Sequence, residues 1–178
     1  MIGSIVILVG LLAAATAVAL ILVALRPGTF RVARSISIRA RPEAVFKLIE
    51  DFHRWRAWSP WENRDPHLQR SYTGAERGPG ATYAWAGDRR VGEGRMEIIE
   101  AVQQERLSIR LDFLKPFAAT NTAEFALVPD GEGTAVTWSM FGPSPFTMRL
   151  IGLFVSMDKM VGKDFEAGLR ALKELAER

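Results

Sequence analysis

The side chains best suited to acid–base chemistry lie in one short stretch around the segment W-S-P-W. Glu62, Asp65 and His67 could supply a general acid and a general base, because carboxyl and imidazole groups both transfer protons. Such chemistry requires the groups to converge on a substrate, which closeness in sequence does not establish. The alternative is structural, with turn capping and packing of Trp58 and Trp61. We adopt the structural interpretation and predict no catalytic residue, leaving Glu62, Asp65 and His67 as the candidates to test.

Composition excludes several other kinds of reactive site. The chain has no cysteine and only two histidines, so it cannot build a disulfide, a thiolate nucleophile, a cysteine zinc site or a multi-histidine metal site. It contains no nucleophile elbow, phosphate loop or dinucleotide fingerprint. The net charge of +3 is small and dispersed, which does not favour nucleic acid binding. We therefore expect no metal, no cofactor and no nucleic acid partner.

Residues 1–27 predict a membrane anchor. From Ile2 to Leu25 the chain carries no charge, and as a helix this run reaches roughly 36 Å, against a hydrocarbon core of about 30 Å. A cleaved signal peptide is the alternative, with small residues at 17–19, but no Lys or Arg precedes the run and the run is too long. Arginines follow it, so the positive-inside rule places the rest of the chain in the cytoplasm. We expect a single-pass protein of the inner (cytoplasmic) membrane.

The remaining residues, 28–178, are expected to form one domain that lies against the membrane. Pro27 and Gly28 end the apolar helix and leave almost no linker before a strand pattern begins at Phe30. Basic side chains of this domain could meet anionic lipid head groups, or could form an ordinary solvated surface. These side chains are Arg31, Arg34, Arg54 and Arg56.

Periodicity predicts an antiparallel sheet followed by a long helix. Strand-like alternation starts at Phe30, helical spacing follows Pro42, and an aromatic helical stretch follows it. Five further strand-like runs are bounded by Gly, Pro or Asp, at 81–86, 92–102, 106–114, 119–128 and 134–141. Apolar and polar residues alternate in them, so one sheet face should be apolar and the other wet. From Phe146 to the C-terminus the spacing is helical, with an apolar stripe starting at Met157 that should pack across the concave sheet face.

The order of elements and four motifs resemble the START-like, or SRPBCC, superfamily. The motifs are F-x-V-x-R-S-I-x-I at 30–38, W-S-P-W-E at 58–62, G-T-x-V-T-W-S-M at 133–140 and M-D-K-M-V-G-x-D-F-E-x-G-L at 157–169. The closer resemblance is to membrane-anchored bacterial members of the polyketide cyclase/dehydrase-like branch. It implies an α+β helix-grip fold, with a strand, two short helices and a six-strand meander, the curved antiparallel sheet wrapping around a long C-terminal helix. It also implies a pocket for apolar molecules between sheet and helix, but does not specify an activity.

The apolar residues assigned to the inner face are the predicted ligand-binding residues. They are Trp85, Met96, Ile98, Ile109, Leu111, Phe113, Phe125, Trp138 and Met140 from the strands and Met157, Met160 and Phe165 from the helix. Asn121 shares this face and could orient a polar ligand head, or could lie at a wet strand end. A filled hydrophobic core predicts the same alternation. A pocket of roughly 300 to 1,000 Å³ would hold a drug-sized apolar molecule.

The leading functional hypothesis is a membrane-anchored domain that binds a lipid or other hydrophobic small molecule as a non-catalytic carrier or sensor. The enzyme alternative is a polyketide cyclase/dehydrase-type activity, in which a pocket carboxylate or histidine assists enolisation or loss of water. The predicted strands carry no inward-facing pair of titratable groups, which disfavours an enzyme. A third hypothesis is a protein-interaction domain with a filled core, whose protein partner the sequence does not identify.

Overall fold

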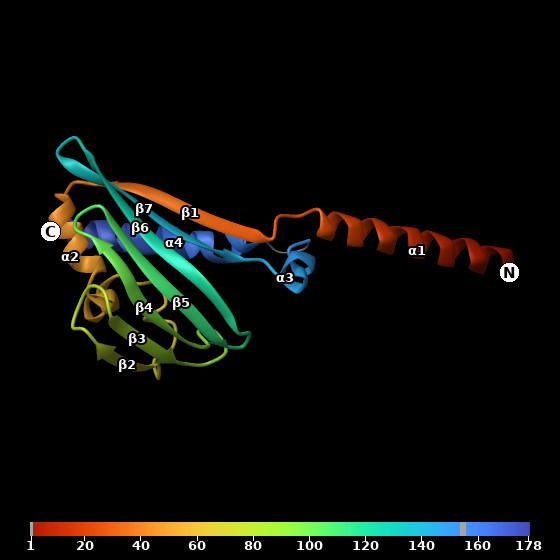
Figure 1. The fold of residues 1–178 in the computed structure, drawn as a ribbon, viewed down its shortest axis with the longest axis horizontal. Coiled ribbons are helices and arrows are strands. Elements are labelled where there is room, and N and C mark those ends of the chain that lie inside the picture. Colours follow the sequence, from red (N-terminus) through yellow and green to blue (C-terminus); the bar gives the residue numbers. More distant parts are fainter. Residues whose placement is uncertain (1, 154–155) are drawn as a thin grey trace.

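A seven-stranded sheet and a long C-terminal helix form the body of the protein, and an apolar helix projects from it (Figure 1). The computed structural model describes residues 2–153 and 156–178. The helices are α1 (Ile2–Ala24), α2 (Pro42–Ile49), the 3₁₀ helix η1 (Phe52–Ala57), α3 (Phe146–Ile151) and α4 (Met157–Ala176). The strands are β1 (Thr29–Ile38), β2 (Gln69–Gly74), β3 (Ala81–Ala86), β4 (Glu93–Val102), β5 (Arg106–Lys115), β6 (Ala119–Asp130) and β7 (Gly133–Pro143).

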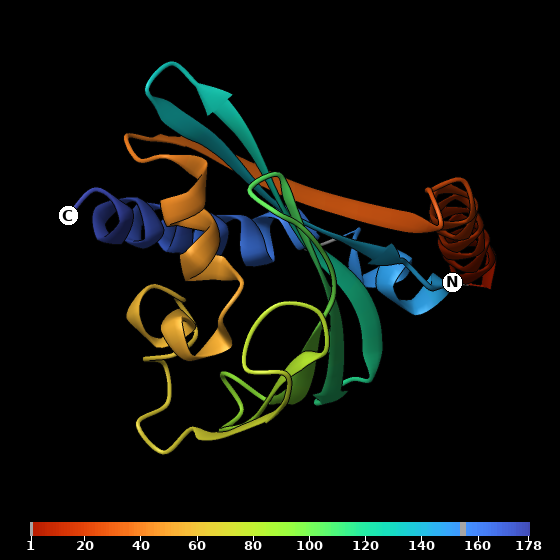
Figure 2. The same ribbon diagram turned by 60° about the vertical axis from the view of Figure 1, so that its left-hand side comes forward.

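Every neighbouring pair of strands in the sheet is antiparallel, in the order β1-β7-β6-β5-β4-β3-β2. Strands β2 to β7 follow one another as neighbours, and β1 pairs with β7, with α2 and η1 between β1 and β2 in the chain. The sheet curls around α4, which contacts β1 (Figure 2). This is the helix-grip arrangement expected from the sequence, so the predicted fold is confirmed.

Alternation explains why these segments pair as strands. In β7, Val136, Trp138 and Met140 are buried on the concave face, while Thr137 is only half-buried on the other face. Phe125 of β6 pairs with Trp138, which brings two aromatic rings to the same face. Strand β2 is polar and its alternation is weak. It lies at the sheet edge and pairs only with β3, where it needs few apolar partners.

The C-terminal helical region is two helices rather than one continuous helix. α3 ends at Ile151 with Gly152 as its C-cap. α4 begins at Met157, where the Ser156 hydroxyl accepts a hydrogen bond from the Lys159 N–H at 3.3 Å. The prediction of unbroken helical structure from 146 is therefore wrong at Gly152, Leu153 and Ser156, because a C-cap ends one helix and an N-cap starts another. Residues 154 and 155 of the predicted helix lie outside the described residues.

The face of α4 that meets the sheet is set by its helical phase. Phe165, Leu169 and Leu172 are buried, and a Cβ on Gly168 would lie 2.8 Å from the Trp138 ring, so the glycine permits close approach. Met160, expected to line the interior, is instead 54% exposed. It lies five residues before Phe165, which turns it about 140° away from that side chain on an α-helix.

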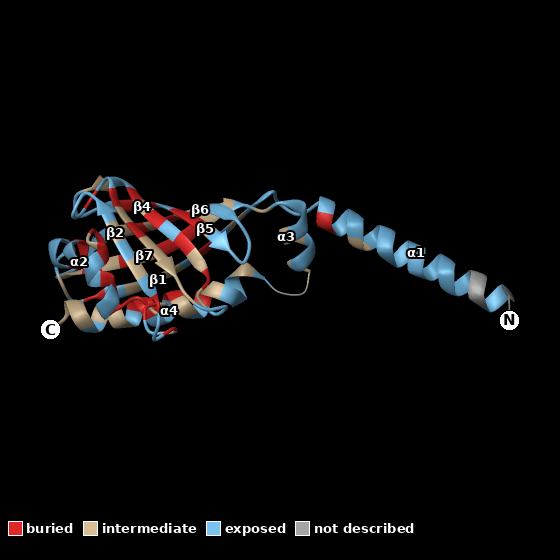
Figure 3. Cartoon of the chain, turned by 90° about the horizontal axis from the view of Figure 1, so that it is seen from below, coloured by how far each residue is buried: buried red, intermediate tan, exposed pale blue. Residues whose placement is uncertain are grey.

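Helix α1 stands clear of the domain, and nearly all of its described side chains are exposed (Figure 3). Its segment Ile7–Ala24, with mean hydropathy 2.8, is long and apolar enough to cross a membrane. A signal sequence passes the same test of length and composition. Near its C-terminal end α1 contacts α3, so the apolar helix joins the domain next to the ends of β1 and β7.

Candidate functional site

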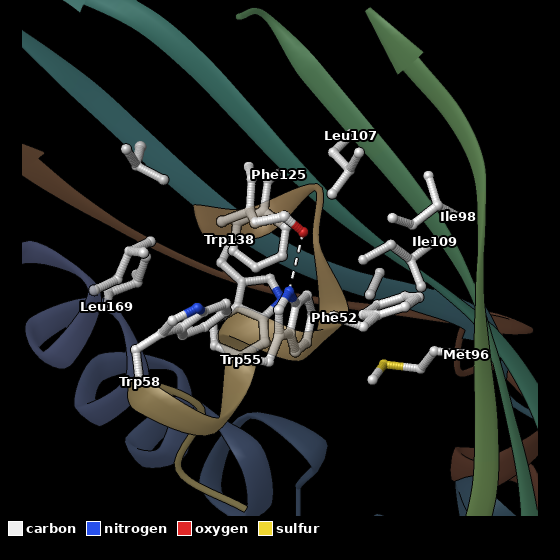
Figure 4. Close-up of a cluster of buried hydrophobic side chains, with 14 of the residues drawn as sticks. Phe52, Trp55, Trp58, Met96, Ile98, Leu107, Ile109, Phe125, Trp138 and Leu169 are labelled. Carbon is white, nitrogen blue, oxygen red and sulfur yellow. Dashed lines mark hydrogen bonds between the residues drawn. The ribbon is translucent and has the colours of Figure 1, made fainter. Parts of the chain in front are cut away.

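Aromatic side chains fill one part of the space between the sheet and α4. This aromatic cluster consists of Trp55, Trp58, Phe125, Trp138 and Phe165, all buried. Figure 4 shows the first four of these side chains. Trp138 stacks on Phe165 and on Phe125, with ring centroids 4.3 and 4.9 Å apart. The Trp55 indole N–H donates to the Ile49 carbonyl oxygen at 3.0 Å, so its polar atom is satisfied inside the core. This part of the interior is a packed core.

Elsewhere in the interior, apolar side chains that face inward remain partly exposed. We call this region the open end; it comprises Phe30, Trp85, Phe113, Met157 and Val161. The strand registers place the first three at one end of the sheet. Phe30 pairs with Gly142 at the end of β7, and Gly94 at the start of β4 pairs with both Trp85 and Phe113. Because β1 begins and β7 ends there, the open end adjoins α1 and α3.

Asn121 lies inside this end of the sheet. It is buried, pairs with Leu111 across β5 and β6, and packs over Gly142, where a glycine leaves room for its amide. Its side chain forms no hydrogen bond with any residue that the structure describes. The sequence left open whether Asn121 points inward or lies at a wet strand end, and in the structure it points inward.

The predicted ligand-binding residues divide between the two regions. Ile98, Ile109, Phe125, Trp138 and Phe165 are buried in the packed core. Met96, Leu111 and Met140 are buried in the same core cluster, and Asn121 is buried near Gly142, whereas Trp85, Phe113 and Met157 belong to the open end. Met160 lies outside on the exposed face of α4.

A hollow of about 490 Å³ adjoins the open end at the β5–β6 turn. It is lined by Arg95, Asp112, Phe113, Leu114, Ala118, Ala119 and Thr120. Phe113 is shared with the open end. Burial raises the pKa of Asp112, but hydrogen bonds from Thr120, Arg110 and Arg95 outweigh it and leave that pKa below its ordinary value. The lining of the hollow therefore combines apolar side chains with the ion pair of Arg95 and Asp112.

Glu62 is buried in a hydrogen-bonded cluster beneath β2 and β3. It is 5% exposed, and its two carboxylate oxygens accept hydrogen bonds from the Tyr83 hydroxyl and the Arg70 guanidinium, each at 2.6 Å. Burial and then the bond to Glu62 raise the pKa of Tyr83, and the bond to Glu62 raises that of Arg70. The carboxylate therefore ties its loop to two strands, and its oxygens are already engaged by protein donors.

Asp65 and His67 lie in the same loop, and Asp65 holds its backbone. The Asp65 carboxylate accepts hydrogen bonds from the backbone N–H of His67 at 2.8 Å and of Asp88 at 2.7 Å. The His67 residue is exposed. No hydrogen bond joins the side chains of Glu62, Asp65 and His67, all of which the structure describes. Within residues 2–153 and 156–178, no group of three acidic or histidine side chains is placed to hold a metal ion.

The order of the strands, the helix grip and its apolar interior agree with a sequence match over almost the whole domain. A family model described as "Polyketide cyclase / dehydrase and lipid transport" matches residues 29–177. The chain belongs to this family. No curated protein matches the sequence significantly.

Solved structures resemble this family member in fold. A Thermobifida fusca protein is 24% identical, with a TM-score of 0.60, over 82% of this chain and 92% of the other. The KanY protein has a TM-score of 0.63 at 15% identity, over 85% of this chain and 100% of the other. A Chromobacterium violaceum protein has a TM-score of 0.58 at 16% identity, covering 86% and 99%. Similarity at this level shows the helix-grip fold alone.

The arginines that could meet lipid head groups are placed differently in this family member. Arg34 points inward and pairs with Asp158 and Glu166 of α4, at 2.7 and 2.8 Å. Two carboxylates of α4 therefore hold its guanidinium, which favours neither a lipid contact nor a freely solvated side chain. Arg54 and Arg56 lie on η1, which contacts α2 at the end of the domain far from α1 (Figure 1). Arg31 lies near Glu124 on the outer sheet face.

Sequence reasoning missed the apolar side chains that are exposed around the open end. They are Leu114, Phe117, Phe146, Leu150 and Ile151. Two signals were available in the sequence. Phe117 lies in a turn between two strands, and the apolar segment 146–151 is so short that it looks like the start of the C-terminal helix. Only the fold brings these segments to one end of the domain.

Proposed function

We propose that this family member binds a hydrophobic small molecule or lipid at the open end, as a non-catalytic carrier or sensor held at the membrane by α1. The observation that carries the proposal is the partial exposure of inward-facing Trp85, Phe113 and Met157 next to a filled core. A ligand that covers them gains roughly 25 cal/mol per Å² of apolar surface removed from water. The family description includes lipid transport, which is consistent with such a ligand.

Asn121 provides the polar complement to this apolar surface. The amide forms no hydrogen bond within the described residues and keeps some contact with solvent, so a hydroxyl, carbonyl or carboxyl group on a ligand could take the place of water as its partner. The amide lies between Leu111 and Gly142 on the inward face. A single polar group among apolar walls orients a ligand, as in most small-molecule sites. We therefore propose a ligand with an apolar body and one polar head.

We infer that α1 is an uncleaved, single-pass anchor in the inner membrane, with the domain at 28–178 in the cytoplasm. The apolar side chains of α1 are exposed along the helix and need a cover. Arg26 follows the helix directly, in agreement with the positive-inside rule. The intact mass of the protein from the membrane fraction tests this, since cleavage of a signal sequence would remove most of α1.

The polar groups near the interior do not favour catalysis. Both oxygens of Glu62 are held by Tyr83 and Arg70, and Asp65 caps a turn. A general acid or base must instead reach a substrate proton. The geometry therefore supports binding without turnover.

Photolabelling tests the proposal on the full chain in lipid nanodiscs. The probe is a palmitic acid that carries a photoactivatable diazirine, and the labelled residues are mapped by mass spectrometry. We expect labels at Trp85, Phe113 and Met157 in addition to α1. Phe113→Arg should lower the labelling of the domain about tenfold, the factor that corresponds to 1.4 kcal/mol.

The matched control is Val128→Arg, which adds the same charge on β6 at a side chain that is 60% exposed and lies on the outer face. It should leave labelling unchanged, and circular dichroism should show both variants folded. Equal labelling of the domain in the wild type and in Phe113→Arg would overturn the proposal. So would labels confined to α1.

A further inference from the structure

Exposed apolar side chains gather around the mouth of the open end. They form a docking collar that consists of Leu114 and Phe117 at the β5–β6 turn and Phe146, Leu150 and Ile151 on α3. Phe117 is 77% exposed. The three ribbon views agree that α3 and the β5–β6 turn lie at the end of the domain from which α1 projects (Figures 1, 2 and 3). An exposed apolar group of this kind marks an interaction surface.

Hydrogen bonds fasten α3 to the end of α1. The Arg149 guanidinium donates to the Arg26 carbonyl oxygen at 3.2 Å, and the Arg26 guanidinium donates to the Gly152 carbonyl oxygen at 2.6 Å. The Ser144 N–H donates to the Gly28 carbonyl oxygen at 2.7 Å. α3 is therefore held beside the point where α1 enters the domain.

The charges at this junction are unbalanced. Arg26 and Arg149 both lie there, and neither forms an ion pair with a carboxylate of the described residues. Apolar side chains next to unpaired cations suit the interface of a bilayer, where the apolar groups enter the acyl boundary and the cations attract anionic lipids. A groove on a partner protein would also cover the apolar side chains. Their position next to the end of α1 favours the bilayer, because a helix that spans the membrane brings this end of the domain to its surface.

We propose that the docking collar inserts into the surface of the membrane that α1 spans, so that the open end faces the bilayer. This inference rests on the proposed function, which places α1 across the membrane. The ligand then enters from the adjoining leaflet, and its class is narrowed to molecules dissolved in the bilayer. The collar then fixes the orientation of the domain on the membrane together with the hydrogen bonds that hold α3 beside the end of α1.

Fluorescence depth measurements test this inference on the full chain. The chain has no cysteine, so each single substitution Phe117→Cys, Leu150→Cys, Leu12→Cys and Val128→Cys gives one site for an NBD label. The chains are reconstituted into vesicles of phosphatidylcholine and phosphatidylglycerol in equal parts. We expect a blue shift at Phe117→Cys and Leu150→Cys, with quenching by lipids that carry a spin label near the head group.

The other two positions separate this inference from the proposed function. Val128 lies at the opposite end of β6, and its label should stay in water. Leu12 lies within α1, and its label should be quenched by lipids spin-labelled deep in the chain. If the Leu12→Cys label is deep while Phe117→Cys and Leu150→Cys behave like Val128→Cys, the docking collar is wrong and the anchor stands. If the Leu12→Cys label is not deep, the anchor itself is wrong and the inference falls with it.

Discussion

Trp138 and Trp85 lie on the same concave face of the sheet and meet opposite surroundings. Trp138 is buried between β7 and α4 and stacks on Phe165 and Phe125. Trp85, near the far edge of the sheet, is half-buried and contacts Phe113 edge-on with centroids 6.0 Å apart. Helix α4 completes a packed core around Trp138, but it leaves the apolar side chains around Trp85 accessible. The same inward alternation therefore yields a filled core where α4 covers the sheet, and an accessible apolar wall, the site of the proposed binding, where α4 does not cover it.

Replacing each tryptophan with alanine should give the largest difference in the free energy of unfolding between the packed core and the open end. Trp138→Ala leaves a cavity in a packed core and should lower the free energy of unfolding by about 3–5 kcal/mol. Trp85→Ala removes a side chain that is already partly hydrated and should cost only about 1 kcal/mol. Urea unfolding of the full chain in detergent, followed by circular dichroism, measures both. Equal losses would show that the two regions are packed alike.

Replacement of Glu62 sharpens the comparison, because the residue supports the sheet but lies outside the open end. Glu62→Gln removes the charged acceptor of Arg70 and Tyr83 and should lower stability by about 1–3 kcal/mol. Fatty acid photolabelling should be unchanged. The matched control Glu124→Gln, on the outer face, should change stability by less than about 1 kcal/mol. Loss of an enzymatic turnover in Glu62→Gln alone would favour the cyclase/dehydrase alternative.

The smallest effect concerns the start of α4, which borders the open end. The Arg34 hydrogen bond holds the pKa of Asp158 below its ordinary value. A carboxyl whose pKa is lower in the folded state contributes stability above its unfolded pKa, and that contribution is lost as the pH falls through the folded pKa. Arg34→Gln should therefore lower the Tm at neutral pH, and the difference from the wild type should shrink in acid. A difference that grows in acid would contradict this pairing.

Much of the fold could be predicted from the sequence because alternation and helical phase are local signals. The strands at 106–114 and 134–141 were found within a few residues of β5 and β7. Strand β2 has no such signal, since an edge strand that pairs only with β3 needs few apolar residues. Met160 was predicted to face the interior because it belongs to the apolar stripe that starts at Met157. The stripe does not show how much of the first turn of α4 the sheet covers, and Met160 is exposed there.

The site could be predicted only as a set of inward-facing residues. Alternation places Trp138 and Trp85 on one face, but it does not say how far the sheet curls or where α4 stops covering it. Those depend on contacts between distant segments, such as Gly168 against Trp138 and Arg34 against Asp158. The split into a filled core and an open end is therefore a property of the assembled fold.

Native mass spectrometry of the full chain, released from detergent micelles after incubation with a fatty acid below saturation, tests whether the open end is a binding site. We predict that the wild type and Val128→Arg retain one apolar molecule and that Phe113→Arg retains about tenfold less. A wild-type chain that retains no apolar molecule, or a Phe113→Arg chain that retains as much as the wild type, would contradict the assignment of the open end as a binding site.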